Sequence, residues 1–132
     1  MVSVGMTKEK FRDYIASFNR DDYEGFGKYY AEDVLLNLGG RMEIRGRDGI
    51  LNFYRDVKKR VRETLVINNV LIDGNILAAE IATEFYGLED WPDFIAGPLM
   101  KGDAINMISF IFYTMNDRGQ YQLIRTARYK VF

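Results

Sequence analysis

From Glu63 onward the spacing of apolar residues is that of strands, and this change limits the folds that the chain can adopt. Before that point, apart from two short stretches that resemble strands, apolar side chains recur every three or four residues, which is typical of one face of a helix. After it they alternate, or form runs rich in β-branched and aromatic residues, which is typical of strands. Helices followed by long antiparallel strands predict an α+β fold, with the helices packed on one face of a curved sheet.

The apolar stripes and the turn residues also place the elements. Helices are predicted over residues 7–18, from Asp21 or Asp22 to Tyr30, and from Arg47 or Asp48 to about Val61. Two short strands are expected in AEDVLLNLGG and RMEIRG. A first hairpin joins TLVINNVLID to ILAAEIATEFYG, and a second joins DAINMISFIFYTMN to QYQLIRTARYKVF. We expect a single domain over residues 1–132, with residues 1–6 disordered.

The composition excludes several classes of function. Eighteen lysines and arginines against 19 aspartates and glutamates leave a net charge of −1, so nothing favours binding to nucleic acid. The chain has no cysteine and no histidine, which excludes disulfides, thiolate or imidazole metal ligands and a histidine base. We therefore expect no metal and no cofactor. Acid/base chemistry would have to rest on residues such as aspartate, glutamate and tyrosine.

Nothing in the sequence points to a membrane. No apolar run reaches the roughly 18 residues of a membrane span. The start, MVSVGMTKEKF, lacks the basic end and the apolar stretch of a secretion signal. We expect a cytoplasmic protein. Its high aromatic content, 14% of the residues, suits a core or a cavity with walls made of rings.

Three stretches give the chain a resemblance to a known family. The order and spacing of DYIASFNRDDYEGFGKYYAEDVLL, IRGRDGILNFYRD and NDRGQYQLIRTARY resemble the nuclear transport factor 2-like superfamily, in its SnoaL-like and ketosteroid-isomerase-like branch. The resemblance covers essentially the whole chain. It implies three N-terminal helices packed in a strongly curved, mostly antiparallel sheet that forms a cone with an internal pocket. It also implies a small apolar ligand and a homodimer through the outer face of the sheet.

Part of the apparatus of ketosteroid isomerases has counterparts here. The tyrosine that donates to the oxyanion in those enzymes resembles Tyr14, and its two supporting tyrosines resemble Tyr30 and Tyr54. The carboxylate base has no counterpart, because its position at the end of the first strand holds Leu38 or Asn37. The position of the second acid is apolar, and the Asp-Arg-Asp arrangement of limonene-epoxide-hydrolase-like members is missing. The resemblance therefore implies the fold and a pocket, but not either of these two reactions.

Two carboxylates lie on the strand ILAAEIATEF, and residues four apart on a strand share a face. The Cβ atoms of Glu80 and Glu84 are about 13 Å apart, too far for a working pair. The residue pattern alone favours placing both in solvent. The register implied by the resemblance instead points them into the pocket, with Glu80 facing Arg128 on the last strand. Arg125 is the alternative partner, and the alternative to the pair is that Arg128 is a solvated strand charge.

Further residues are expected to line the pocket. The loop over residues 88–103 is long for a hairpin connection, so Trp91 and Phe94 are expected to close the mouth over an apolar ligand. The alternative is a packed surface loop. Ser109 faces inward in the same register. The full set of expected ligand-binding residues is Phe18, Tyr30, Tyr54, Glu84, Trp91, Phe94, Ser109 and Arg128.

These expectations favour a pocket enzyme that transfers protons on an apolar oxygenated molecule, such as a polyketide, terpenoid, steroid or aromatic. Isomerisation, cyclisation, dehydration and other lyase steps belong to this class. Tyr14 is expected to polarise an oxygen of the substrate, and Glu80 is expected to act as acid/base. The alternative is a non-catalytic ligand-binding or assembly protein on the same fold, which the missing base and the absent histidines favour.

Overall fold

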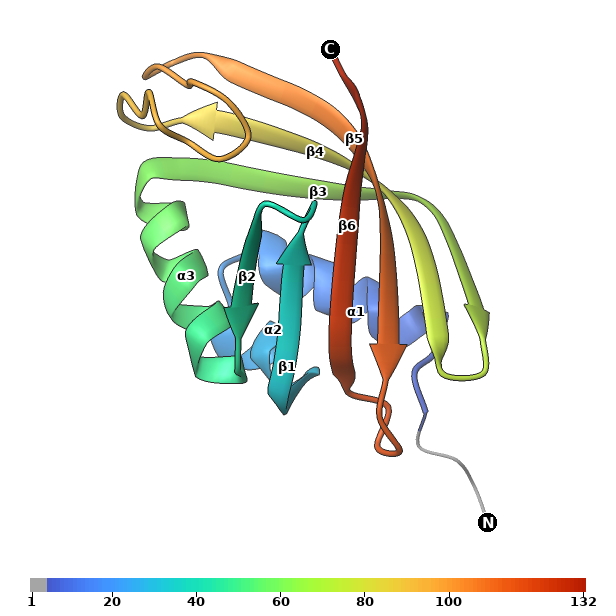
Figure 1. The fold of residues 1–132 in the computed structure, drawn as a ribbon. Coiled ribbons are helices and arrows are strands. Elements are labelled where there is room, and N and C mark those ends of the chain that lie inside the picture. Colours follow the sequence, from blue (N-terminus) through green and yellow to red (C-terminus); the bar gives the residue numbers. More distant parts are fainter. Residues whose placement is uncertain (1–4) are drawn as a thin grey trace.

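A computed structural model describes residues 5–132, in which three helices lie against a bent sheet of six strands (Figure 1). The elements follow in the order α1 (Lys8–Asn19), α2 (Tyr23–Gly27), β1 (Tyr30–Leu38), β2 (Met42–Arg45), α3 (Arg47–Arg60), β3 (Val61–Asp73), β4 (Ile76–Gly87), β5 (Ala104–Met115) and β6 (Tyr121–Val131). None of the helices in this part of the chain is long and apolar enough to cross a membrane.

The strands form one sheet in the order β2-β1-β6-β5-β4-β3. Every neighbouring pair is antiparallel except β1 and β6, which are parallel. The long strands bend strongly, and α1 lies behind them on the concave side (Figure 1). The predicted α+β cone with a mostly antiparallel sheet is therefore confirmed.

Local sequence signals explain where the first two helices begin and end. The side chain of Thr7 caps α1 and that of Asp22 caps α2, each by accepting a hydrogen bond from the backbone N–H three residues on. The second helix ends at Gly27, whereas the apolar spacing predicted that it would end at Tyr30. Tyr30 already belongs to β1, where it pairs with Tyr121 of β6. Pairing in the sheet therefore overrides the helical spacing of the preceding tyrosines.

The residues just before α1 contribute to the core. Residues 1–4, part of the segment predicted to be disordered, lie outside the described residues. Met6, in contrast, is only 8% exposed, and its sulfur accepts a hydrogen bond of 3.8 Å from the hydroxyl of Tyr121. An apolar side chain two residues before the helix thus belongs to the core.

The end of α1 is tied to an edge of the sheet. The side-chain amide of Asn19 donates to the carbonyl oxygen of Leu65, and its Oδ1 accepts from the N–H of the same residue, both at 2.8 Å. Leu65 lies on β3, which is the outermost strand on that side of the sheet. Asn19 therefore occupies backbone groups that a further strand would otherwise pair.

Apolar side chains gather in two clusters inside the cone. The larger one lies between α1 and the sheet, at what we call the closed end of the cone. Its aromatic residues are Phe11, Tyr14, Phe18, Phe26, Tyr30, Tyr113 and Tyr121. The smaller one lies under the loop 88–103 and contains Val57, Val61, Phe85, Phe94 and Leu99. Phe53 of α3 packs against this smaller cluster, so α3 borders it.

Burial alternates along β4 and shows which of its faces points to the core. Leu77, Ala79 and Ile81 are buried, whereas Glu80 and Glu84 lie on the opposite, outer face. The family resemblance implied that the two glutamates point inward, and this is wrong. The implied register of β4 differs from the observed one by one residue, which exchanges the two faces of the strand. That register would have left the larger apolar side chains of the strand in water, at a cost of about 1.5–3 kcal/mol for each.

The loop 88–103 is anchored tightly where β4 ends. The N–H of Gly87 donates to the carbonyl oxygen of Asp103 at 2.9 Å, and its own carbonyl accepts from Gly102 at 2.8 Å. The backbone of Met100 passes so close to Gly87 that a Cβ at residue 87 would overlap the Met100 carbonyl oxygen. The absence of a side chain at this position thus holds the loop against the sheet.

A pair of glycine substitutions tests this anchoring. We expect Gly87→Ala to lower the free energy of unfolding by about 1–3 kcal/mol, because the new Cβ displaces the backbone of Met100. Gly49→Ala, in α3, meets only ordinary contact with Ile44 at 3.6 Å and is expected to raise the free energy of unfolding by up to about 1 kcal/mol. Urea denaturation of both variants measures the difference. Equal stability of Gly87→Ala and the wild type would contradict the close contact.

Candidate functional site

A cavity of about 510 Å³ lies between α3, the loop 88–103 and the concave face of the sheet. Most of the side chains around it are apolar, as is common in sites for small organic ligands. The residues that line it are Leu38, Gly39, Arg41, Phe53, Tyr54, Val57, Glu63, Phe85, Phe94, Ile95, Ala96, Met107, Ser109, Thr126, Ala127 and Arg128.

Glu63 is the one acidic residue among the described residues that line this cavity. It lies at the start of β3, directly after α3, where Val61 is fully buried. Because side chains alternate along a strand, Glu63 shares the inward face with Val61 and stands opposite Phe85 of β4. The intervening Arg62 points outward, where its guanidinium carbon is 4.6 Å from the ring centroid of Tyr86.

The surroundings of Glu63 favour its neutral form. Burial raises the pKa of Glu63 from its ordinary value of 4.5 to about 7, although the positive charge of Lys58 acts in the opposite direction. Lys58 itself is occupied elsewhere, since its Nζ donates to the Phe18 carbonyl oxygen at 2.8 Å and pairs with Asp21 at 2.7 Å. Glu63 is thus a carboxyl group that changes its charge near neutral pH.

Tyr54 of α3 brings a hydroxyl group to the same cavity. Burial raises the pKa of Tyr54 well above its ordinary value of 10, and the negative charge of Glu63 raises it further. Its ring packs edge-on against Phe18, with the centroids 4.9 Å apart. Within residues 5–132, neither the Tyr54 hydroxyl nor the Glu63 carboxylate has a hydrogen-bond partner, and neither is sealed from solvent. Both polar tips therefore remain free for a ligand in the cavity.

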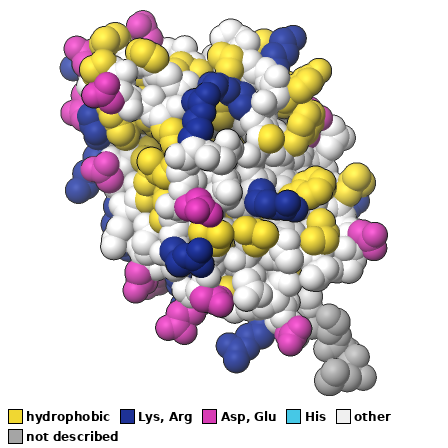
Figure 2. All heavy atoms as spheres, in the orientation of Figure 1, with side chains coloured by type: hydrophobic (Ala, Val, Ile, Leu, Met, Phe, Trp, Pro, Cys, Tyr) yellow, Lys and Arg dark blue, Asp and Glu magenta, His cyan; other side chains and the backbone are white. Residues whose placement is uncertain are grey.

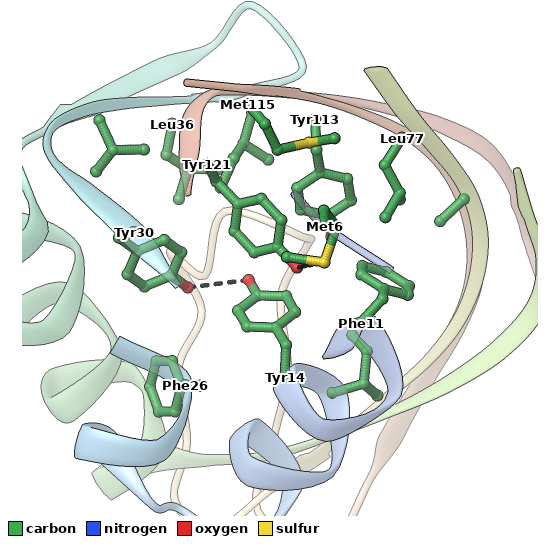
Figure 3. Packing of buried hydrophobic residues seen from close by; sticks show 14 of the residues in the cluster. Met6, Phe11, Tyr14, Phe26, Tyr30, Leu36, Leu77, Tyr113, Met115 and Tyr121 are labelled. Carbon is green, nitrogen blue, oxygen red and sulfur yellow. Dashed lines mark hydrogen bonds between the residues drawn. The ribbon is translucent and has the colours of Figure 1, made fainter. Parts of the chain in front are cut away.

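Tyr14 and Tyr30 belong to the aromatic cluster at the closed end, and neither lines the cavity. Their hydroxyl oxygens are 3.0 Å apart and share a hydrogen bond (Figure 3). Burial is the main cause that raises the pKa of both hydroxyl groups above the ordinary value. The ring of Tyr14 also lies 4.9 Å from that of Tyr121. Tyr14 therefore lies outside this cavity, and the role that the family resemblance implies for it stays a prediction.

The other residues expected to bind a ligand divide into two groups. Tyr54, Phe94, Ser109 and Arg128 line the cavity. Phe18 is buried in the closed-end cluster. Trp91 lies beside the cavity and not in its wall: it packs on Phe94, and the guanidinium carbon of Arg60 is 3.7 Å from its ring centroid. From this loop, Phe94 therefore lines the cavity, whereas Trp91 packs on Phe94 outside the cavity wall.

The expected pair of Glu80 and Arg128 does not form. On the outer face, the Glu80 carboxylate accepts hydrogen bonds from the side chains of Asn68 and Asn69, at 3.1 and 3.2 Å. Arg128 instead donates to the carbonyl oxygen of Ala96 at 3.4 Å. Because β4 presents its glutamates outward, neither Glu80 nor Glu84 reaches the cavity.

Sequence reasoning missed Glu63 because the residue stands where the helical spacing changes to strand spacing. The signal that would have found it is the stripe Val61, Glu63, Leu65 and Ile67, in which a single acid interrupts an apolar face of a strand. Arg41 was also missed, since the tight turn that carries it showed no functional pattern. No group of three or more acidic side chains within residues 5–132 is placed to hold a metal ion.

Comparisons with known proteins agree with this arrangement. The model of the SnoaL-like domain matches residues 11–120. A protein of Pseudomonas putida KT2440 assigned as a polyketide cyclase has 22% identity and a TM-score of 0.77, over 96% of this chain and 93% of that one. An LEH-like epoxide hydrolase of M. tuberculosis has 14% identity and a TM-score of 0.74, over 92% and 80% of the two chains.

A third solved structure, of a Kribbella flavida DSM 17836 protein assigned as a ketosteroid isomerase, has 20% identity and a TM-score of 0.70. The match covers 95% of this chain and 78% of that one. At these identities the likeness concerns the fold. No curated protein is detectably similar in sequence.

Replacing Glu63 tests its raised pKa through stability. The folded state keeps a proton on Glu63 up to about pH 7, whereas the unfolded chain loses it near 4.5. Stability that the neutral form contributes is therefore complete below 4.5 and is lost as the pH rises through about 7. We expect Glu63→Gln, which cannot ionise, to raise the free energy of unfolding by up to about 3 kcal/mol near pH 8 and to change it little near pH 4.

Chemical denaturation at the two pH values measures this difference. Glu84→Gln is the matched control, because Glu84 is exposed on the outer face of the same sheet. We expect it to leave stability nearly unchanged at both pH values. A Glu63→Gln variant that behaves like this control would contradict the raised pKa.

Proposed function

We infer that this chain, which belongs to the SnoaL-like domain family, is an enzyme of isomerase, cyclase or dehydratase type that acts on an apolar, oxygenated small molecule. The observation that carries this proposal is Glu63, a carboxyl group with a pKa of about 7 in an apolar cavity. A general acid/base works best when its pKa lies near the working pH. Such a value at a cavity wall is typical of a catalytic site.

In the proposed reaction, ionised Glu63 removes a proton from a carbon next to a carbonyl group of the substrate. The electron pair of the broken C–H bond moves onto the carbonyl oxygen, which becomes an enolate. The Tyr54 hydroxyl donates a hydrogen bond to that oxygen, and in an apolar cavity such a hydrogen bond gains strength as the charge develops. The raised pKa of Tyr54 keeps its proton in place for this role.

The proton on Glu63 then decides the product. Its return to a different carbon completes an isomerisation, whereas its transfer to a departing hydroxyl group completes a dehydration. Attack of the enolate carbon on a second carbonyl of the same molecule, which then takes the proton, closes a ring. All three outcomes need the same two protein groups and leave Glu63 ready for another cycle.

The walls of the cavity define the substrate in general terms. Phe53, Val57, Phe85, Phe94 and Met107 provide apolar surface on several sides. A volume of about 510 Å³ suits a small organic molecule of more than one ring. Polyketide, terpenoid, steroid and aromatic substrates all fit this description.

A second candidate function is that of a non-catalytic ligand-binding or assembly protein on the same fold. The aromatic packing of the closed end favours this non-catalytic function, because the hydroxyl groups of Tyr14 and Tyr30 are hydrogen-bonded to each other. The position of the family's carboxylate base holds Leu38 or Asn37, and neither can take a proton; Leu38 also lines the cavity. On this view Tyr54 and Glu63 bind the polar groups of a ligand without transferring protons.

Hydrogen exchange of a ketone probe distinguishes the two functions. We expect the protein to speed the exchange of the α-protons of 2-tetralone in D₂O, followed by NMR. The rate should rise with pH and level off above about 7, because only ionised Glu63 accepts a proton. Glu63→Gln should lower the catalysed rate by roughly 10²- to 10⁴-fold, and Tyr54→Phe by about 10²-fold.

Glu84→Gln again serves as the control and should exchange the probe at the wild-type rate. If Glu63→Gln and Glu84→Gln exchange the probe equally fast, Glu63 is not the base. Saturable binding of 2-tetralone with no exchange above that in buffer would favour the non-catalytic function.

We also propose that two copies associate through the outer face of the sheet. Phe110 and Phe112 of β5 are 42% and 47% exposed there, and Tyr129 of β6 is 65% exposed. Phe110 and Tyr129 pack together, with ring centroids 5.0 Å apart. Figure 2 shows hydrophobic side chains gathered on the right-hand side of this face. Apolar groups exposed together in this way are typical of a surface that another molecule covers.

A charged pair of substitutions tests the association. We expect the wild type to sediment as a dimer, and Phe110→Lys combined with Phe112→Lys to sediment as a monomer with an unchanged circular dichroism spectrum. Met42→Lys is the control, since Met42 is 38% exposed on β2, at an edge of the sheet. A monomeric wild type at micromolar concentration would exclude the proposed dimer.

A further inference from the structure

Two arginines line the cavity from neighbouring segments. Arg41 follows β1 in the turn to β2, and Arg128 lies on β6. Because Leu38 of β1 pairs with Thr126 of β6, the turn and the end of β6 lie side by side. The N–H of Arg41 donates to the carbonyl oxygen of Leu38 at 3.0 Å, which fixes the turn. Two positive charges are thereby placed at one side of the cavity.

Neither guanidinium is neutralised within the described residues. The four ion pairs within residues 5–132 use other cations. Arg128 makes one long hydrogen bond, to the Ala96 carbonyl oxygen at 3.4 Å, and the side chain of Arg41 makes none within the same residues. Arg47, in contrast, directs two donors at the Tyr30 carbonyl oxygen, at 2.9 and 3.0 Å. A guanidinium has five N–H donors, so most of those on Arg41 and Arg128 remain available.

The opposite side of the cavity carries the proposed reacting groups. β5 and β4 separate β6 from β3, so Arg128 and Glu63 are about 14 Å apart across the strands, at about 4.8 Å per strand. Arg128 is in register with Ile81 of β4 and Glu63 with Phe85, which adds an offset of about 13 Å along the strands. Apolar side chains such as Phe85 and Met107 fill the wall between them. The whole chain has a net charge of −1, so the two arginines are a local feature and not part of a generally basic protein.

We propose that the cavity binds an apolar ligand that bears a carboxylate at one end, with the carboxylate held by Arg41 and Arg128. The planar fork of a guanidinium matches the two oxygens of a carboxylate, which makes arginine well suited to this group. With its carboxylate at the arginines, the ligand extends along the apolar wall and places its far end beside Glu63 and Tyr54. This inference rests on the proposed small-molecule site, and it adds the charge class and the orientation of the ligand.

A matched pair of ligands tests the proposal. Isothermal titration calorimetry would compare 2-naphthoate with 2-naphthamide, which has nearly the same shape and no charge. We expect the wild type to bind 2-naphthoate at least about ten-fold more tightly, since hydrogen bonds between charged groups contribute more than neutral ones. This preference should shrink as the salt concentration rises.

The arginine variants assign the preference to this side of the cavity. Arg41→Met combined with Arg128→Met should bind the two probes with equal affinity, while its affinity for 2-naphthamide stays near that of the wild type. Arg118→Met is the matched control, because Arg118 lies in the turn between β5 and β6 and does not line the cavity. It should keep the full preference for 2-naphthoate.

The possible results separate the two proposals. Equal affinity of the wild type for both probes, or a preference that survives in the double arginine variant, would overturn the carboxylate site and leave the cavity as a site for neutral ligands. Failure of the wild type to bind either probe would count against the cavity as a ligand site, and therefore against the proposed function as well.

Discussion

The packing of aromatic rings between α1 and the sheet is the interaction on which the rest of the structure depends. The ring of Tyr14 contacts five other aromatic rings, with centroids 4.9 to 6.2 Å away. Buried hydroxyl groups need partners, and Tyr14 and Tyr30 supply them to each other. These two tyrosines, at the centre of the packing, do not line the cavity. The cavity that carries Glu63 and Tyr54 lies instead near α3 and the loop 88–103.

The tyrosines that the family resemblance groups together therefore have different roles in the structure. Tyr14 and Tyr30 hold the fold together, whereas Tyr54 stands at the boundary and turns its hydroxyl group to the cavity. The acid of the cavity, Glu63, lies at the junction of α3 and β3, where the helix continues into the strand without a loop. Burial of Val61 fixes the phase of the new strand, and Glu63 must then face inward. A shift of one residue at this junction would turn it into solvent.

The fold could be predicted from the sequence because periodicity, caps and turns all agree along the chain. Four of the expected ligand residues line the cavity, among them Phe94 and Arg128. The failures have physical causes. The register implied by the family resemblance points Glu80 inward. Burial of Leu77 and Ile81 is more favourable than burial of a carboxylate, so the strand presents these two to the core and Glu80 to the outer face. Glu63 was overlooked because neither helical nor strand spacing is clear at the point where one becomes the other.

The contact between Asn19 and β3 has a consequence for how copies of this protein can meet. An outermost strand with free N–H and carbonyl groups invites a second molecule to extend the sheet, and repeated extension leads to fibres. At Leu65 both groups are already taken by a side chain of the same molecule. Growth by edge pairing is therefore obstructed there, whereas a two-fold contact through the face of the sheet, as in the proposed dimer, would close after two copies.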